Sequence, residues 1–223
     1  MPNRWVIILT SLFLTGCLGE YLPESIADLY ETPPFTWSYE LFESTITEDG
    51  YTRTIFRTND VKYWTLEGST IWTVWGEAEA VFTSRTVRMS KSSGFSTGGY
   101  GIVFCHGEHE IEGYKKHAML VVMINNNRQY IIGKAVGGVF TDFGWWRTTP
   151  HLDSGGAPNL VTVTYDEEAE KFRLIINGHE VDQFSDNDFP VLRSGRNGYI
   201  AVITPFDNFP FTGINISFLE DKR

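Results

Sequence analysis

Short strand-like segments follow one another through almost the whole chain after residue 35, and this pattern limits the possible fold more than any other feature. Three segments are nearly continuously apolar, as expected of central strands covered on both faces: GYGIVFC (99–105), AMLVVMI (118–124) and YIIGKAV (130–136). By contrast, NLVTVTY (159–165) alternates apolar and polar residues, as a strand with one buried face does. About a dozen segments recur every 10–15 residues or so, which is typical of an antiparallel sandwich or barrel.

The dipeptide Asn177-Gly178 marks a tight hairpin between two of these segments. Both residue types tolerate the positive φ angles of the two-residue turns that join antiparallel strands. We therefore expect residues 171–176 and 179–184 to form a pair of strands. The 21 glycines of the chain agree with a fold that needs many tight turns.

The N-terminus, MPNRWVIILTSLFLTGC, has the organisation of an export signal. Arg4 precedes an apolar run that is too short to cross a bilayer, since a spanning helix needs about 20 apolar residues. The run ends in Leu14-Thr15-Gly16-Cys17, which resembles the lipobox of bacterial lipoproteins, where the signal is cut before a cysteine that becomes lipidated. We expect three parts: a signal peptide (1–16), a lipid anchor and tether (17–34) and a single domain (35–223).

A lipid on Cys17 places the mature protein in the bacterial cell envelope, because several acyl chains on one residue anchor stably. By resemblance to the sorting of enteric lipoproteins, Leu18 after this cysteine favours the outer membrane if the cell has one. An ordinary secretory signal with a chance cysteine is the alternative. With Cys17 lipidated, Cys105 is the one thiol left, so no intrachain disulfide forms and Cys105 is expected to be a small buried residue.

The net charge of −10 argues against nucleic acid and against an anionic lipid surface as partners. Both of these recognise proteins through basic residues, and this chain has 18 Lys and Arg against 28 Asp and Glu.

Several stretches of the second half follow one another in a familiar order: GYGIVF (99–104), then residues 119–140, 158–181 and 193–203. They resemble the concanavalin A-like lectin/glucanase (laminin G-like) jelly roll over about residues 70–220. The resemblance implies an all-β, two-sheet antiparallel jelly-roll sandwich. The matching positions are turn glycines, such as Gly178, and core residues, such as Val163, so no catalytic residue is carried over with them.

The stretch GEHEIEG (107–113) presents Glu108, Glu110 and Glu112 on one side of an extended chain. It resembles the Glu-apolar-Asp-apolar-Glu strand of glycoside hydrolases in the same superfamily, where the outer glutamates are the nucleophile and the acid/base. His109 and Glu110 depart from that pattern. Flanking glycines and lysines favour an exposed acidic connection between two central strands, and catalysis is the alternative.

The segment VFTDFGWWRTTPHLDSGG (139–156) places Trp145 and Trp146 beside Arg147 and Asp142. If the segment is extended, the two indoles face opposite ways and at least one lies near the surface. An exposed indole stacks well on a sugar ring, and Arg and Asp side chains hydrogen-bond hydroxyl groups. These four residues are the expected ligand-binding candidates. The alternative is that one tryptophan caps the core and the other lies under a loop.

No metal site and no cofactor are expected, because His106, His109 and His117 are typical of solvated residues rather than of a ligand set. The sequence favours a cell-envelope lipoprotein whose non-catalytic β-sandwich binds a carbohydrate or a partner protein. The alternatives are a glycoside hydrolase that acts through Glu108 and Glu112, and a structural envelope component. The expected partners are the membrane, through the lipid on Cys17, and a glycan or an envelope protein.

Overall fold

The computed structural model describes residues 41–58, 70–111, 113–137, 139–185, 192–202 and 213–221. The expected signal peptide, the tether and Cys17 lie outside these residues, so the statements about them stay predictions. Every element in the described part of the chain is a β-strand. No helix there is long and apolar enough to cross a membrane.

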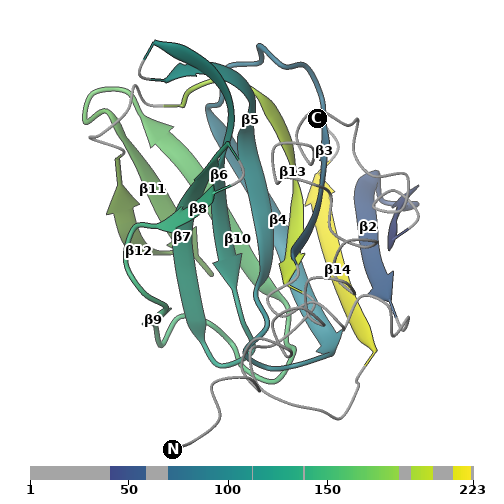
Figure 1. Ribbon diagram of the computed structural model, residues 1–223. Helices are drawn as coiled ribbons and strands as arrows, with labels where there is room; N and C mark the ends of the chain where they lie inside the picture. The colour runs from purple at the N-terminus through teal and green to yellow at the C-terminus, as the bar shows by residue number, and fades with distance from the viewer. Residues whose placement is uncertain are drawn as a thin grey trace, which may run out of the picture.

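The strands form two antiparallel sheets that pack face to face (Figure 1). Sheet A contains seven strands in the order β1 (Phe42–Ile46), β2 (Tyr51–Thr58), β14 (Ile214–Asp221), β4 (Ser84–Ser93), β10 (Asn159–Asp166), β11 (Lys171–Ile176) and β12 (His179–Phe184). Sheet B follows the order β3 (Thr70–Trp75), β13 (Arg196–Val202), β5 (Tyr100–Ile111), β6 (Tyr114–Ile124), β7 (Gln129–Val136) and β8 (Val139–Asp142), and β9 (Arg147–Thr148) pairs with β7. The predicted all-β, two-sheet antiparallel sandwich is confirmed.

The main core lies between the two sheets and follows from the alternation of side chains along the strands of sheet A. On β10, Val161 and Val163 are fully buried, whereas Leu160, directly before Val161, points outward. Phe56 on β2 and Val87 on β4 are fully buried in the same way. Each such side chain stabilises the fold by about 1.5–3 kcal/mol relative to an exposed position.

Sheet B is apolar on both of its faces, as the continuous apolar segments predicted. Leu120 and Val122 on β6 point into the main core. Val121 between them is also fully buried, in a second cluster on the opposite face of sheet B. Met119 and Ile131 belong to this second cluster. An aliphatic surface of this kind has few polar groups for a sugar, so it is a poor site for one.

The predicted hairpin at Asn177-Gly178 is confirmed to the residue, since β11 ends at Ile176 and β12 begins at His179. Both turn residues have positive φ, 50° at Asn177 and 83° at Gly178. The Asn177 side chain also ties the turn to β10, because its Oδ1 accepts a hydrogen bond from the N–H of Leu160 at 2.8 Å.

The prediction that residues 107–113 form a polar connection is wrong in one respect. Strand β5 continues through Glu108 and Glu110 to Ile111, and the register places these glutamates opposite His117 and Lys115 on β6. Backbone pairing therefore holds them in a long hairpin, with Glu110 directly opposite the cation of Lys115. Both side chains are exposed, as predicted. Glu112 lies outside the described residues.

Cys105 is fully buried, which confirms the expectation of a small core residue. It has a positive φ of 55° where β5 shifts its register against β6, so the strand contains a bulge at this point. Burial raises the pKa of its thiol to about 12. The thiol therefore stays protonated near neutral pH, and a thiolate nucleophile is not formed there.

Candidate functional site

A pocket of about 480 Å³ opens at the side of the sandwich where β3 is the edge strand of sheet B. In Figure 1, β2 of sheet A lies beyond β3 and β14 on this side. The lining residues come from six strands, β1, β2, β3, β4, β13 and β14: Ser44, Thr52, Thr54, Trp75, Ser84, Arg85, Asn197, Glu220 and Asp221. We call this hollow the Trp75 pocket.

The Trp75 pocket exists because inward positions that are apolar elsewhere become polar at this end of sheet A. On β14 the inward series of Ile216 and Phe218 ends in Glu220, whose side chain is 20% exposed. On β4 the inward-facing positions include Val87 and, two residues earlier, Arg85, which is buried. Polar side chains cannot fill a core as densely as apolar ones, and they need hydrogen-bond partners at its margin.

Arg85 is held rigidly by its hydrogen bonds. Its Nε and Nη2 donate to the two carboxylate oxygens of Glu220 at 2.9 and 3.0 Å, a bidentate ion pair. Its Nη1 donates to the backbone oxygens of Gly198 at 2.7 Å and Val103 at 3.1 Å. Four of the five N–H groups of the guanidinium are therefore used, and the charged pair is fixed before any ligand arrives.

The Trp75 ring packs against the protein on one side and is open to solvent on the other. The ring packs on Tyr199 with centroids 4.8 Å apart, and the Arg85 guanidinium carbon lies 5.0 Å from the Trp75 ring centroid. The hydroxyl of Tyr199 donates to Glu220 at 3.0 Å, and burial raises the pKa of this hydroxyl. Trp75 itself remains 42% exposed. The pocket thus has a fixed indole platform beside a fixed carboxylate.

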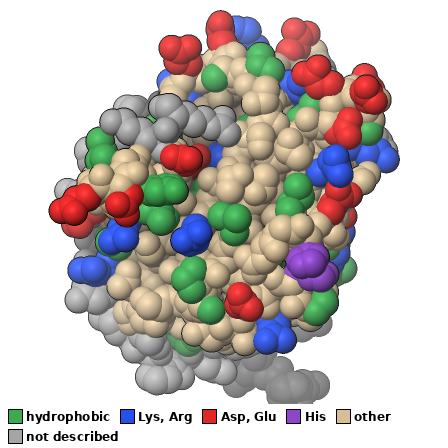
Figure 2. Space-filling view, turned by 180° about the vertical axis from the view of Figure 1, so that it is seen from behind, with side chains coloured by type: hydrophobic (Ala, Val, Ile, Leu, Met, Phe, Trp, Pro, Cys, Tyr) green, Lys and Arg blue, Asp and Glu red, His purple; other side chains and the backbone are tan. Residues whose placement is uncertain are grey.

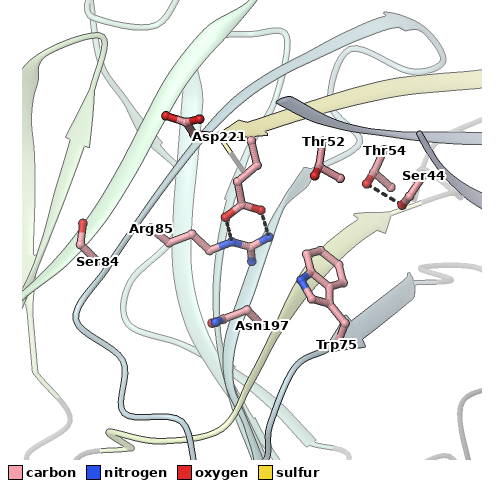
Figure 3. A pocket seen from close by; sticks show the side chains of 9 residues that line it. Ser44, Thr52, Thr54, Trp75, Ser84, Arg85, Asn197 and Asp221 are labelled. Carbon is pink, nitrogen blue, oxygen red and sulfur yellow. Dashed lines mark hydrogen bonds and ion pairs between the residues drawn. The ribbon is translucent and has the colours of Figure 1, made fainter. Parts of the chain in front are cut away.

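Small polar groups surround this platform. In Figure 3, Thr52, Thr54 and Ser44 lie on the same side of Arg85 as Trp75. The hydroxyls of Ser44 and Thr54 hydrogen-bond each other at 2.8 Å. Asn197 contributes a buried Oδ1 that accepts no hydrogen bond from the described residues. Such a mixture of hydroxyls, an amide and one flat apolar ring matches the surface of a sugar.

The predicted ligand-binding residues of segment 139–156 lie outside the lining of the Trp75 pocket. Trp145 is 85% exposed, and Trp146 is partly buried against the second cluster of sheet B. Arg147 forms an ion pair with Asp182 and donates to the backbone oxygen of Phe143 at 2.8 Å. None of the four predicted residues lines the Trp75 pocket.

Asp142 is the last residue of β8, and its carboxylate accepts the N–H of Gly144 at 3.3 Å. Its role is therefore local, at the turn that follows the strand. The structure thus places Trp145 on the surface, and Arg147 holds the segment to β12 through Asp182.

The glutamates of the β5–β6 hairpin lie in water. The Glu108 carboxylate is 3.0 Å from the ammonium of Lys115, and the two side chains are 49% and 80% exposed. The hydrogen bond from Lys115, together with its charge, holds the pKa of Glu108 below its ordinary value. A glycosidic general acid needs the opposite, a raised pKa from partial burial.

The three histidines of this hairpin do not form a metal site. His109 shares a hydrogen bond of 3.0 Å with the backbone oxygen of Cys105, and the rings of His106 and His117 stack with centroids 6.3 Å apart. In the part of the chain that the structure describes, no three His, Cys, Asp or Glu side chains are arranged to hold a metal ion.

Trp75, Arg85, Tyr199 and Glu220 were missed by the sequence analysis. One signal for Glu220 was available, because the alternation of Ile214, Ile216 and Phe218 continues to this residue and turns its carboxylate inward. No comparable signal links Trp75 to Glu220, which lie on different sheets and far apart in the sequence.

The fold is shared with proteins of very different sequence. No family model matches this chain, and no curated protein matches it. Among solved structures it is similar to the carbohydrate-binding module CBM66 from Bacillus subtilis, with a TM-score of 0.52 and 11% identity over 81% of this chain and 89% of that one. It is also similar to a prokaryotic β-1,3-1,4-glucanase (lichenase) derived from a mouse hindgut metagenome, with a TM-score of 0.51 and 9% identity over 82% and 84%.

These likenesses show a common architecture and no more, because the identities are so low. The chain is a concanavalin A-like jelly-roll sandwich, as the sequence resemblance implied.

Proposed function

We propose that this protein is a lipid-anchored component of the bacterial cell envelope whose β-sandwich binds a glycan in the Trp75 pocket without cleaving it. The observation that carries the proposal is the half-exposed indole of Trp75, fixed beside the bidentate Arg85–Glu220 pair in a pocket of about 480 Å³. This volume falls within the range of ligand pockets, about 300–1,000 Å³.

The parts of the pocket suit a sugar residue one by one. The apolar face of a pyranose ring stacks on the indole, and its hydroxyls donate to Glu220 and exchange hydrogen bonds with Thr52 and Ser84. Arg85 and Tyr199 already hold Glu220 in place, so binding orders few side chains and costs little conformational entropy. The two similar structures are a carbohydrate-binding module and a glucanase, which agrees with the proposal by analogy of fold.

Binding is favoured over catalysis by the contacts of Glu220. Both of its oxygens already accept hydrogen bonds from the Arg85 guanidinium, and one also accepts a hydrogen bond from the hydroxyl of Tyr199. A glycosidase needs two carboxyl groups at a defined separation on either side of the bond that it cleaves. Asp221 follows Glu220 directly in β14, so the two side chains leave the strand on opposite faces.

The glycan proposal is tested with the full chain in detergent on an array of envelope and plant polysaccharides. Trp75→Ala should abolish retention of the bound glycan, because the stacking platform is lost. Trp145→Ala is the matched control, since it removes an indole that is even more exposed and lies outside the pocket. Absence of any bound glycan, or equal effects of the two variants, would remove the proposal.

The anchor proposal has its own test. Metabolic labelling with a fatty acid should modify the wild-type protein and leave Cys17→Ser unlabelled, and the variant should leave the membrane fraction. Labelling that survives in Cys17→Ser contradicts the assignment of the lipid to this residue.

A further inference from the structure

A second hollow, of about 540 Å³, lies on the outer face of sheet A, on the side that faces away from the main core. Figure 2 views the molecule from behind and shows basic and hydrophobic side chains close together on the left half of this face, with acidic ones around them. The residues that line it belong to four neighbouring strands and the turn after β1: Thr47, Asp49, Tyr51, Arg53, Thr86, Arg88, Leu160, Leu219 and Asp221. We call it the outer groove.

The strand register sets out the floor of the outer groove as a row. Arg53 on β2 lies opposite Leu219 on β14, Leu219 lies opposite Arg88 on β4, and Arg88 lies opposite Leu160 on β10. Adjacent strands are about 4.8 Å apart, so the two arginines leave the sheet about 10 Å apart with a leucine between them. Their long side chains can therefore converge on one group above Leu219.

Neither arginine of this row has an ionic partner among the residues that the structure describes. Both side chains are exposed, and in the described ranges no carboxylate lies within ion-pair distance of Arg53 or Arg88. On the same face of the sheet, Arg173 shows the usual arrangement, since its Nε donates to Glu180 at 2.8 Å. Two exposed guanidiniums without a described ionic partner therefore form a local basic site in a chain with a net charge of −10.

Besides the two arginines and two aspartates, the outer groove is lined by apolar and hydroxyl-bearing side chains. Leu160 is 37% exposed and Tyr51 is 40% exposed, which is high for side chains of this size. Tyr51 lies opposite Asp221, in the row next to the arginines. Thr86 lies two residues before Arg88 on β4, and its hydroxyl hydrogen-bonds the hydroxyl of Thr162 on β10 at 2.9 Å.

We infer that the outer groove binds an acidic saccharide, with the carboxylate of a uronic acid residue between Arg53 and Arg88. Planar guanidiniums pair with carboxylates through charge-assisted, often bidentate hydrogen bonds. The C–H face of the sugar ring rests on Leu219 and Leu160, and its hydroxyls reach Thr86 and Asp221.

Asp49 and Asp221 give the groove its selectivity. They repel bare polyanions such as nucleic acids or sulfated polymers, whose charges would fall on both rows. A uronate carries one charge per sugar residue. Its carboxylate can therefore bind Arg53 and Arg88, while its hydroxyl groups donate hydrogen bonds to Asp49 and Asp221.

This inference does not depend on the glycan site beside Trp75. Glu220 faces the Trp75 pocket from the inner side of β14, and Leu219 faces the outer groove from the opposite side, although Asp221 at the strand end borders both hollows. The variant Trp75→Ala should therefore leave uronate binding unchanged, and the two proposals can fail separately.

The test is calorimetric titration of the detergent-solubilised full chain with oligomers of galacturonate, of guluronate and mannuronate, and of hyaluronan. At least one should bind, with an affinity that falls as salt is added. Arg53→Gln and Arg88→Gln should each weaken that binding about 10- to 100-fold, the value expected for one hydrogen bond to a charged group. The neutral methyl ester of the same oligomer should not bind.

The matched control is Arg57→Gln, which makes the same charge change on the same strand, at an exposed position outside the groove. Its affinity should stay within about twofold of the wild type, because distant exposed charges are screened by salt. The proposal is overturned if none of the oligomers binds, if Arg57→Gln weakens binding as much as Arg88→Gln, or if the methyl ester binds equally well. Equal competition by inorganic phosphate would show a simple anion site and would also overturn it.

Discussion

Near the ends of β2, β4 and β14, both faces of sheet A carry arginines and carboxylates. The arginines of the inner face and of the outer face differ in their burial and in their partners. Arg85, on the inner face, is buried and uses its guanidinium on Glu220 and two backbone oxygens. Arg88, on the outer face of the same strand, is exposed and unpaired by any described carboxylate. Because successive side chains of a strand point to opposite faces, residues three positions apart lie on different faces. The two arginines therefore have different roles.

The comparison shows how one strand can serve stability on one side and binding on the other. A buried guanidinium must be fully hydrogen-bonded, so Arg85 is committed to the protein and can only shape a pocket. An exposed guanidinium keeps its hydration and its freedom, so Arg53 and Arg88 can exchange water for a ligand. The predictions below test this difference, beginning with the largest expected effect.

The substitution Arg85→Met should break the inner arrangement. It leaves the Glu220 carboxylate without its cationic partner in a largely shielded position, and two backbone oxygens lose their donor. Breaking a buried pair in this way costs about 3–5 kcal/mol. Urea unfolding followed by tryptophan fluorescence measures the loss, and a loss under about 1 kcal/mol would contradict the assigned role.

A pH titration extends the contrast to β5, where His106 is shielded and Glu108 lies in water two residues away. Desolvation, with added effects of the charges of His117, Arg196 and His109, lowers the pKa of His106 to about 4 from its ordinary value of 6.5. The folded state therefore favours neutral His106, and its contribution to stability is complete above pH 6.5 and lost as the pH falls toward 4.

This contribution amounts to at most about 3 kcal/mol at low pH. Carboxylates titrate in the same range, so the informative measurement is the difference between the wild type and His106→Gln in unfolding experiments from pH 7 to pH 4. The variant should lose less stability over this range. Parallel pH profiles for the two proteins would show that His106 is not shielded.

The smallest effect is expected for the outer arginines. Arg53→Gln and Arg88→Gln should each change the free energy of unfolding by no more than about 0.5 kcal/mol, because exposed, unpaired charges add little to stability. The same variants should lose uronate binding, so a change in binding without a change in stability is the result that distinguishes the outer from the inner face. Destabilisation comparable to that of Arg85→Met would remove the distinction.

Much of the fold was predictable because it depends on local patterns. The period-2 alternation of Val161 and Val163 placed these side chains in the core, and Asn177-Gly178 set the bounds of β11 and β12. The extent of β5 was misjudged, because the glycines at 107 and 113 read as loop residues. Strand pairing with β6 overrode that local tendency.

The site was much less predictable. The sequence analysis chose Trp145 and Trp146 because they are adjacent to each other and to charged residues in the chain. The structure leaves Trp145 exposed on the surface and packs Trp146 against sheet B. Trp75, which the sequence analysis did not choose, lines a pocket, and its polar neighbours Arg85 and Glu220 come from two other strands.

By itself the sequence determined the all-β class and the sharp hairpin turn, and it predicts an envelope anchor at Cys17, which stays a prediction. These follow from residue period, turn chemistry and a contiguous motif, all of which act over a few residues. Only the tertiary structure decided which polar residues meet, because Trp75, Arg85 and Glu220 become neighbours through the pairing and stacking of β3, β4 and β14. Such contacts depend on the order of strands in each sheet and on which strand faces meet, and the local sequence determines neither.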